Sequence, residues 1–567
     1  MLVRIRLEIW ALTAMAIGAI AGVMRAAESV ADDSRDSEAS LVARRAARFE
    51  QLPRPQAPPQ FVLPPDGKGK PSPALSEIDR FIYSSWREAK LPEAASPPPV
   101  CDDATFCRRV HLDLIGVIPT PVELNHFLAD RSADKRTKLI DRLLARDDDY
   151  AAHWTPFWED ALASQTVLSQ GGIPTRGDYR AWIYDGLRQN RPYDVMAAEL
   201  LDPTMPGRHR AVTEDLFGIK YHIEYVRNED HTATLQTAAN VGQVFLGTSM
   251  KCASCHDHFD NAEWPQARFL GFAGLFAPRD LERLRCDVPT GQTVPARFPF
   301  ELPDTDGKVP TELDARLHLT AQWITDPLNP RFAKTMVNRL WRRYLGLGLY
   351  EPADDFRDDT PGSQPQLLEW LAYDFIEHGC DLKHTIRQIV ASRTYQHRYE
   401  ASLEDHFDAA DRTRPRYYRS PSLRRMTAEQ TIDSLRVALT GEIEAEQRCY
   451  LDARSTALMR ALGRPASRNE ISTARPDDVA VVQALELLNG HELHELIGQS
   501  ELRLKPSVLR DPRRVIDQLY LATLTRHATS EEKRFAKEAL PTGDAQDEAI
   551  RDWLWALVCS PEFQYIK

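Results

Sequence analysis

The segment KCASCHDHFDNAEW at residues 251–264 contains the side chains best suited to chemistry in this sequence. Cys252 and Cys255 are separated by two residues, and His256 follows directly. Two thiols at this spacing can reach the two vinyl groups of one porphyrin, and the adjacent imidazole can then bind the iron. We therefore expect haem c on Cys252 and Cys255, with His256 as the proximal iron ligand. A distal ligand would come from His222, His231 or a methionine elsewhere, and five-coordinate iron is the alternative.

The same segment allows two other interpretations. A tetrahedral zinc site needs four sulfur or nitrogen ligands, and the segment offers them in Cys252, Cys255, His256 and His258. These four side chains lie within seven residues, whereas structural zinc sites usually divide their ligands into two separated pairs. The third interpretation is a disulfide between Cys252 and Cys255 in a structural, exported scaffold.

An acidic loop, EPADDFRDDTP at residues 351–361, offers carboxylates to a hard cation. Its acids are Asp354, Asp355, Asp358 and Asp359. Such a cluster could bind calcium, which prefers oxygen ligands. It could also form a metal-dependent hydrolase centre together with a second set, His256, Asp257, His258 and Asp260. The loop lacks the glycine and bidentate glutamate of a calcium-binding loop, so solvated or helix-capping acids are the simpler interpretation.

A basic segment, RTRPRYYRSPSLRRM at residues 412–426, concentrates positive charge among tyrosines. Its arginines are Arg412, Arg414, Arg416, Arg419, Arg424 and Arg425. Guanidinium groups of this density suit an anionic ligand such as a sulfated or carboxylated polysaccharide. The net negative charge of the chain favours the other interpretation, a solvated arm that pairs with acidic helices of the same protein.

Composition and charge narrow the range of partners. The chain of 567 residues is 43% apolar and 27% charged, so it can bury more than one hydrophobic core. Its formal net charge is -12 at pH 7, and this gives no overall attraction to a phosphate backbone. We therefore expect no nucleic-acid partner, and the partner classes that we expect are a redox partner or a polysaccharide.

Residues 1–27 have the pattern of a secretory signal peptide. Two arginines precede an apolar run from Ile9 to Met24, and small residues follow it. The run is shorter than the roughly 20 apolar residues that cross a bilayer, so we expect cleavage; an uncleaved signal would be the only membrane attachment. The mature protein is therefore expected to be periplasmic or secreted, where disulfides persist. Cys101 and Cys107 flank a short loop and could form one.

The rest of the chain is predicted to be mainly α. Residues 28–74 are rich in proline and are expected to form a linker. Helical periodicity dominates from residue 75 onward, and a helix over 232–249 is predicted to lead into the cysteines. Residues 278–310 lack a helical face, and a connection over residues 279–320 is predicted to separate two helical domains, 75–278 and 321–567. Predicted helix starts lie at Ser76, Thr120, Ser363, Thr427, Asp511 and Thr529.

Long stretches of the sequence resemble a known pair of domains. The planctomycete-type exported cytochrome-like (PSCyt) domain of unknown function is similar to FCRRVHLDLIGVIPTPVELNHFLADRSADKRTKLIDRLL and FLGTSMKCASCHDHFDNAEW. The PSD-type domain of unknown function that usually follows it is similar to NPRFAKTMVNRLWRRYLGLGLYEPADDF and SLRRMTAEQTIDSL. The resemblance runs from residue 76 to the C-terminus. It implies an exported, mainly helical protein with a haem-type motif at Cys252, Cys255 and His256.

These observations predict an exported c-type haem protein that acts in electron transfer or in haem-dependent oxidation of an extracellular or periplasmic substrate. One competing hypothesis is a metal-dependent hydrolase or polysaccharide-binding module. It would hold zinc or calcium with the residues named above as weaker candidates: His258, Asp260, Asp354 and Asp355. The other competing hypothesis is the structural scaffold.

Overall fold

The structure of the chain is a computed structural model. It describes residues 38–63, 74–162, 177–205, 231–285, 288–303, 307–357, 360, 362–451, 455–466, 471–473, 475, 481–499, 511–541 and 546–567. Four features named above lie outside the described residues: the predicted signal peptide, His222, Asp358 and Asp359. The side chain of His231 lies outside them as well. Within the described ranges, no helix has both the length and the apolar character needed to cross a membrane.

The fold is mainly α, as predicted, and the chain divides into two compact units. Unit 1 comprises residues 1–53, 192–241 and 250–332. Unit 2 comprises residues 54–191, 242–249 and 333–567. Each unit therefore contains chain segments from both sides of the 279–320 connection.

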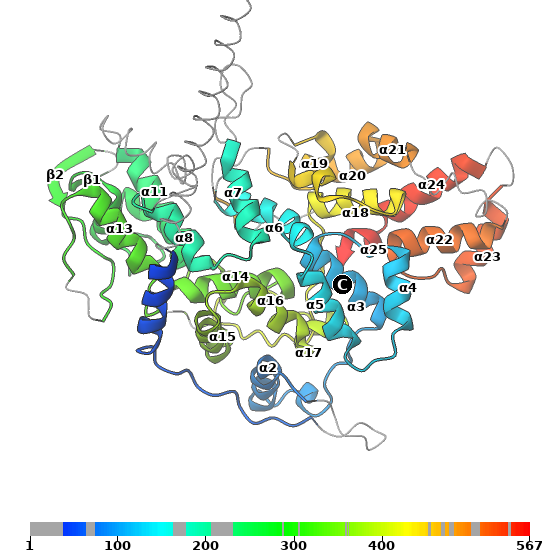
Figure 1. Ribbon diagram of the computed structural model, residues 1–567, viewed down its shortest axis with the longest axis horizontal. Coiled ribbons are helices and arrows are strands. Elements are labelled where there is room, and N and C mark those ends of the chain that lie inside the picture. The colour runs from blue at the N-terminus through cyan, green and yellow to red at the C-terminus, as the bar shows by residue number, and fades with distance from the viewer. Residues whose placement is uncertain are drawn as a thin grey trace, which may run out of the picture. The chain divides into compact units, whose positions relative to one another are not determined.

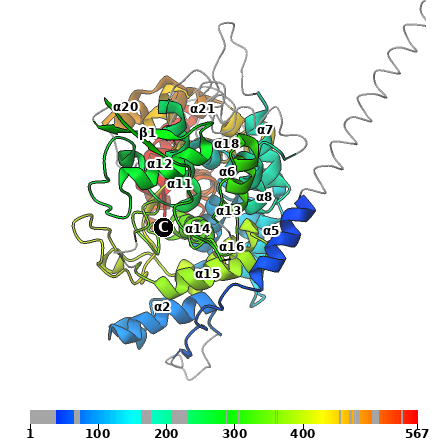
Figure 2. The same ribbon diagram turned by 90° about the vertical axis from the view of Figure 1, so that its left-hand side faces the viewer.

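Unit 1 combines helices with a β-hairpin (Figure 1). Strands β1 (Leu281–Arg285) and β2 (Val288–Val294) pair antiparallel, with Leu281 opposite Val294, and they lie in the stretch for which no helical face was found. Helix α12 (Gln266–Ala273) contacts both strands (Figure 2), and α13 (Leu313–Ile324) contacts α8 (Tyr193–Leu201). Arg316 of α13 donates to the carbonyls of Gly274 and Ala277 at 2.8 and 2.7 Å.

Residues 38–49 form a helix inside the segment that was predicted to be a proline-rich linker. Its prolines begin only at Pro53, so they do not interrupt the helix. Two arginines tie the helix to other parts of unit 1. Arg45 lies 2.8 Å from Asp194, and Arg48 lies 3.0 Å from Asp326. Residues 51–63 have no regular structure, as the linker prediction implied.

Unit 2 is a helical assembly with one very short antiparallel strand pair, β3 (Arg424–Arg425) with β4 (Tyr565–Ile566). Helix α2 (Glu77–Glu88) contacts α15 (Pro365–Glu377) and α17 (Arg393–Gln396) (Figures 1 and 2). Further helices of this unit are α3 (Asp103–Ile115), α4 (Pro121–Ala129), α5 (Lys135–Leu144), α6 (Asp147–Ala161), α7 (Gly177–Arg188), α16 (Leu382–Ala391), α18 (Ala428–Thr440), α19 (Ala457–Ala461), α20 (Val481–Asn489), α21 (His491–Gly498), α22 (Pro512–Leu524), α23 (Ser530–Ala539), α24 (Gln546–Cys559) and α25 (Pro561–Gln564). Helix α14 (Phe332–Leu345) begins at the last residue of unit 1 and lies otherwise in unit 2.

Helix α3 is buried from Phe106 to its last residue, including its charged side chains. Arg108 donates to the carbonyls of Thr523 and Phe563, each at 2.8 Å. Arg109 donates to the carbonyl of His397 at 3.1 Å and to that of Lys567. Because a buried guanidinium must have hydrogen-bond acceptors, this helix fixes the positions of distant parts of the chain.

Most predicted helix starts are confirmed. Thr120, Thr427 and Thr529 each form a complete capping box, and Ser76 and Asp511 cap α2 and α22. The start predicted at Ser363 is wrong, because α15 begins at Pro365. The hydroxyl of Ser363 instead accepts a hydrogen bond from the backbone N–H of Arg416 at 3.2 Å.

Asp79 provides a test of this architecture. It is 1% exposed and accepts hydrogen bonds from the backbone N–H groups of Arg393 and Thr394 at 3.0 and 2.9 Å. Asp79→Ala leaves these buried donors without an acceptor, so we expect the free energy of unfolding to fall by about 3–5 kcal/mol. Urea unfolding followed by circular dichroism measures the change. Asp134→Ala, at an exposed acid, should leave the free energy of unfolding nearly unchanged, and equal effects of the two substitutions would contradict the assignment.

Candidate functional site

Four residues separate the haem-type segment from helix α11 (His231–Leu246), which lies close to the helix predicted over 232–249. Gly247 follows the helix with φ +57, in the left-handed region that favours glycine. A Cβ at this position would lie 2.6 Å from Thr335 Oγ1, so a larger residue does not fit. The chain then forms a short 3-10 turn, η3 (Lys251–Ser254), which contains Cys252.

Two side chains that are not predicted haem ligands, Asp257 and Gln266, fix the backbone of the segment. Asp257 Oδ1 accepts a hydrogen bond from the backbone N–H of Gln266 at 2.7 Å, at the start of α12. The amide of Gln266 donates to the carbonyl of Ser254 at 3.2 Å and to that of Leu284 at 2.9 Å. Ala253, between the cysteines, is fully buried. The loop is therefore connected to α12 and to β1.

The two cysteines of the segment differ in exposure. Cys252 is exposed and Cys255 is half-buried. Their sulfurs are not joined in a disulfide, and Cys255 Sγ lies 3.5 Å from the hydroxyl of Ser254. A disulfide is also absent between Cys101 and Cys107, because Cys107 points along α3 toward His111 Nδ1 at 3.7 Å.

His256 is exposed and has one of its ring nitrogens engaged. Nδ1 lies 2.7 Å from the carbonyl oxygen of Asp257, which can only accept, so Nδ1 carries the proton. Nε2 then holds the lone pair that a metal ion needs. A ligating histidine usually donates its other N–H to a carbonyl or carboxylate in this way. The ring centroid of Phe259 lies 4.1 Å from that of His256, and Phe259 is 82% exposed.

His258 has the opposite arrangement. Its Nδ1 accepts a hydrogen bond from the backbone N–H of Asp260 at 3.2 Å, so the proton of the neutral ring lies on Nε2. Neither nitrogen then offers a lone pair to a metal. The ligand atoms of Cys252, Cys255, His256 and His258 also do not come together: among the described residues, three or more such atoms lie within 4.8 Å only at another place.

Asp354 and Asp355 lie in unit 2, and the haem-type segment lies in unit 1. Asp354 pairs with Arg339 at 2.7 Å and accepts a hydrogen bond from Thr473. Asp355 lies 2.6 Å from Arg357 and 3.2 Å from Arg412. Both carboxylates are thus paired with guanidinium groups. This arrangement supports a structural role more than calcium binding.

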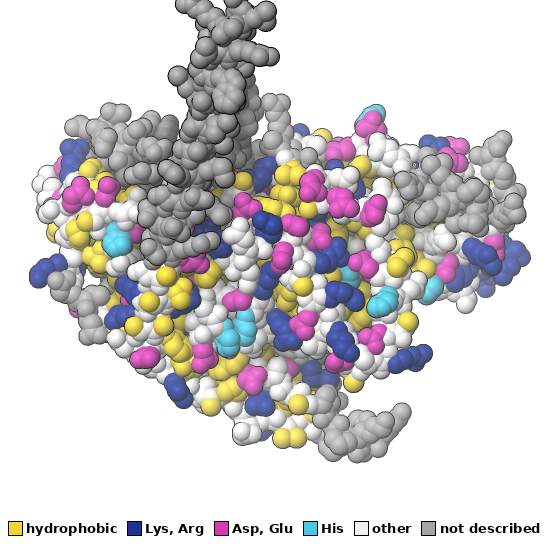
Figure 3. Space-filling model, in the orientation of Figure 1, with side chains coloured by type: hydrophobic (Ala, Val, Ile, Leu, Met, Phe, Trp, Pro, Cys, Tyr) yellow, Lys and Arg dark blue, Asp and Glu magenta, His cyan; other side chains and the backbone are white. Residues whose placement is uncertain are grey.

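The arginines of segment 412–426 pair within the protein, as the favoured interpretation predicted. Three of them form ion pairs in unit 2: Arg412 with Asp355, Arg419 with Glu93 and Arg424 with Asp113. A fourth, Arg416, is 2% exposed and donates to the carbonyl of Leu349 at 3.4 Å. The segment is therefore partly buried and not a solvated arm. On the face drawn in Figure 3, basic and acidic side chains are interspersed.

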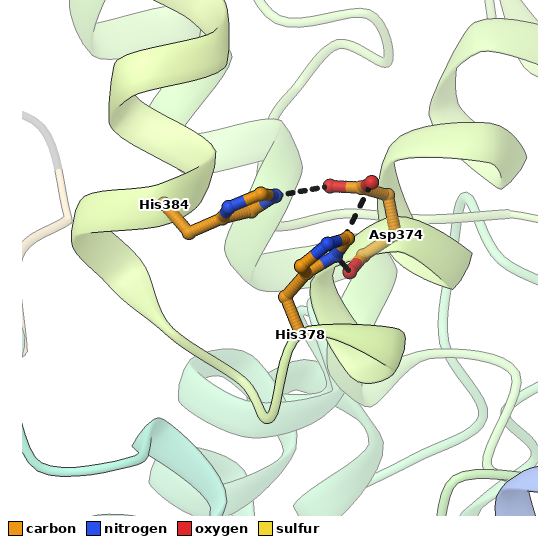
Figure 4. A group of neighbouring side chains, drawn as sticks. All are labelled: Asp374, His378 and His384. Atoms are coloured by element: carbon orange, nitrogen blue, oxygen red, sulfur yellow. Dashed lines mark hydrogen bonds and ion pairs between the residues drawn. The ribbon is translucent and has the colours of Figure 1, made fainter.

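A third group, not found from the sequence, could hold a metal ion. Asp374, His378 and His384 bring their ligand atoms within 4.8 Å of one another (Figure 4). Asp374 and His378 lie four residues apart at the end of α15, and this spacing was the available signal. His384 Nε2 lies 2.9 Å from Asp374 Oδ2, and the amide of Gln388 donates to the same oxygen at 2.8 Å. Hydrogen bonds among these side chains satisfy the group, so a metal would have to displace them.

Comparison with known proteins gives two family matches, in the predicted order. Residues 77–280 match PSCyt2, described as a protein of unknown function (DUF1549). Residues 315–540 match PSD1, described as a protein of unknown function (DUF1553). No curated protein and no solved structure matches the chain.

The exposure of the haem-type segment predicts a difference in thiol reactivity. Iodoacetamide at pH 8 should alkylate Cys252 at least about a hundredfold faster than Cys107, because the thiolate is the nucleophile and must be accessible. Burial raises the pKa of Cys107 to about 12. Timed quenching of protein produced without haem, followed by peptide mass spectrometry, measures both rates. Similar rates at the two cysteines would show that the segment is not open to solvent.

Proposed function

We propose that this chain, a protein of the PSCyt2 and PSD1 families, is an exported c-type haem protein. The haem is attached through Cys252 and Cys255, and His256 is the proximal iron ligand. When bound, the haem supplies one-electron redox chemistry. The protein then acts in electron transfer or in haem-dependent oxidation of a periplasmic or extracellular substrate.

The observation that carries the proposal is the state of His256. Its Nδ1 donates to the carbonyl of Asp257, so its Nε2 is the available ligand atom, and the ring is exposed. This arrangement fits a histidine that binds a metal ion through Nε2, whereas a capping histidine would have that nitrogen engaged or its ring buried. The adjacent His258, whose Nδ1 accepts from Asp260, lacks this property. The segment therefore distinguishes its two histidines, and it favours the one that directly follows Cys255.

The surroundings of the segment also fit a flat apolar group. Phe259 exposes 82% of its surface beside His256, although aromatic side chains are usually at least half buried. Cys252, on the same segment, is exposed as well. A porphyrin attached to the cysteines would cover apolar surface that is otherwise in contact with water.

The test is expression in a bacterial host with haem-attachment machinery and export to the periplasm. We expect a haem absorption band that remains with the protein after denaturation and acid–acetone extraction, because thioether-linked haem is not extracted. The double variant Cys252→Ala/Cys255→Ala should lose this band. His256→Ala should shift or broaden the spectrum, because the proximal ligand is removed.

His258→Ala is the matched control, and its spectrum should be that of the wild type. Colourless wild-type protein would overturn the proposal. Stoichiometric zinc or calcium in such protein would then favour the hydrolase alternative, and an intact Cys252–Cys255 disulfide without metal would favour the scaffold.

A further inference from the structure

Unit 2 contains a cavity lined by an unusual number of arginines. Its walls come from α3, α6, α14, α18 and the stretch from Ser422 to Arg425. The arginines that line it are Arg339, Arg342, Arg343, Arg424, Arg425, Arg448 and Arg475. Four carboxylates line the same cavity, those of Asp113, Asp160, Glu429 and Asp433. Positive charge therefore predominates among its lining residues.

Ion pairs already occupy all four of these carboxylates. The pairs are Arg424 with Asp113 at 2.7 and 2.8 Å, Arg475 with Asp160 at 2.6 Å and with Glu429 at 2.6 Å, and Arg448 with Asp433 at 3.0 Å. Two further arginines of the lining pair with acids that do not line the cavity, Arg339 with Asp354 at 2.7 Å and Arg342 with Glu351 at 3.2 Å. Each of the four lining carboxylates is therefore already paired with an arginine and does not neutralise a further positive charge.

Arg343 differs from these paired arginines. Among the described residues no carboxylate pairs with it, and its Nη2 instead lies 3.2 Å from Nε2 of His153. The guanidinium lies over the rings of Trp154 and Phe157, 4.6 and 5.3 Å from their centroids. Burial, together with the charges of Arg343 and Arg448, lowers the pKa of His153 well below its ordinary value. His153 is therefore neutral, and its Nε2 accepts the hydrogen bond that Arg343 donates.

One donor beside Arg343 is unsatisfied. The Nε atom of Arg424 is buried and has no hydrogen-bond partner among the described residues. Arg424 adjoins Arg343, since its Nη1 donates to the backbone carbonyl of Arg343 at 2.7 Å. Leaving a charged donor such as Arg424 Nε away from water without an acceptor is unfavourable.

We propose that this cavity binds an oxyanion, a carboxylate, sulfate or phosphate group, with Arg343 as its principal ligand and Arg424 beside it. The planar fork of a guanidinium matches two oxygens of such a group. Binding would give Arg343 the counter-charge that no side chain among the described residues supplies. This site lies wholly in unit 2, and the proposal does not depend on haem attachment. The anion is either a free inorganic ion or the acidic group of a sugar.

The test is the thermal unfolding midpoint of the full-length protein, titrated with sodium sulfate, sodium phosphate or sodium glucuronate at constant ionic strength. We expect a saturable rise in the midpoint with at least one of them, because a ligand of the folded state stabilises it by mass action. Sodium chloride and glucose should have no such effect. A stronger response to glucuronate indicates an acidic sugar, and a stronger response to sulfate or phosphate indicates a free ion.

Arg343→Met should weaken the apparent affinity at least about tenfold. Without ligand, its unfolding midpoint should equal or exceed that of the wild type, because an unpaired charge has been replaced by an apolar chain. Arg343→Lys keeps the charge but not the fork, and should bind with intermediate affinity. If the methionine variant does not fold, the lysine variant provides the test.

Arg387→Met is the matched control. Arg387 lies on α16 of the same unit, is exposed and pairs with Asp141 at 2.6 Å, so its removal should leave the response to anions unchanged. The proposal fails if the wild type responds to none of the three anions beyond ionic strength. It also fails if both Arg343 variants respond as the wild type does.

Discussion

Buried charge must be matched, and this constraint organises unit 2. Helix α3 carries Arg108, Arg109 and Asp113 on a surface that is excluded from water. The two arginines donate to the backbone carbonyls of residues 397, 523, 563 and 567. Asp113 accepts hydrogen bonds from the side chains of Tyr395 and Arg424. Apolar packing alone tolerates small shifts of one helix against another, whereas a guanidinium between fixed carbonyls does not. The helices around α3 are therefore held in one arrangement.

The two sites proposed for this chain differ in how they are exposed to solvent. At the haem-type segment, the atoms that would react are open to water, while the backbone beneath them is fixed by Asp257 and Gln266. In the arginine-lined cavity, Arg343 is half-buried, and no carboxylate of the described residues pairs with it. At both sites, side chains are in an unfavourable environment, and a bound ligand would make that environment more favourable.

Local chemistry explains what could be predicted from the sequence. Capping at Thr120, Thr427 and Thr529 depends on residues three positions apart, and these starts were correct. Ser363 failed because its hydroxyl bonds to the backbone of Arg416, 53 residues away. The roles of Asp354 and Asp355 could not be predicted from the sequence either, because their arginine partners, which include Arg339 and Arg412, are distant in the chain. The group at Asp374 needed the turn between two helices to bring His384 close.

The interleaving of the two units has a consequence for biosynthesis. Segments of unit 1 alternate along the chain with segments of unit 2, and the latter includes both Arg109 and its acceptor at Lys567. Neither unit coincides with one family domain, so dividing the gene at residue 300 would separate parts of each core. Unit 2 joins residues 54–191 to residues 333–567, so its early segments leave the ribosome before the later segments that they contact have been synthesised.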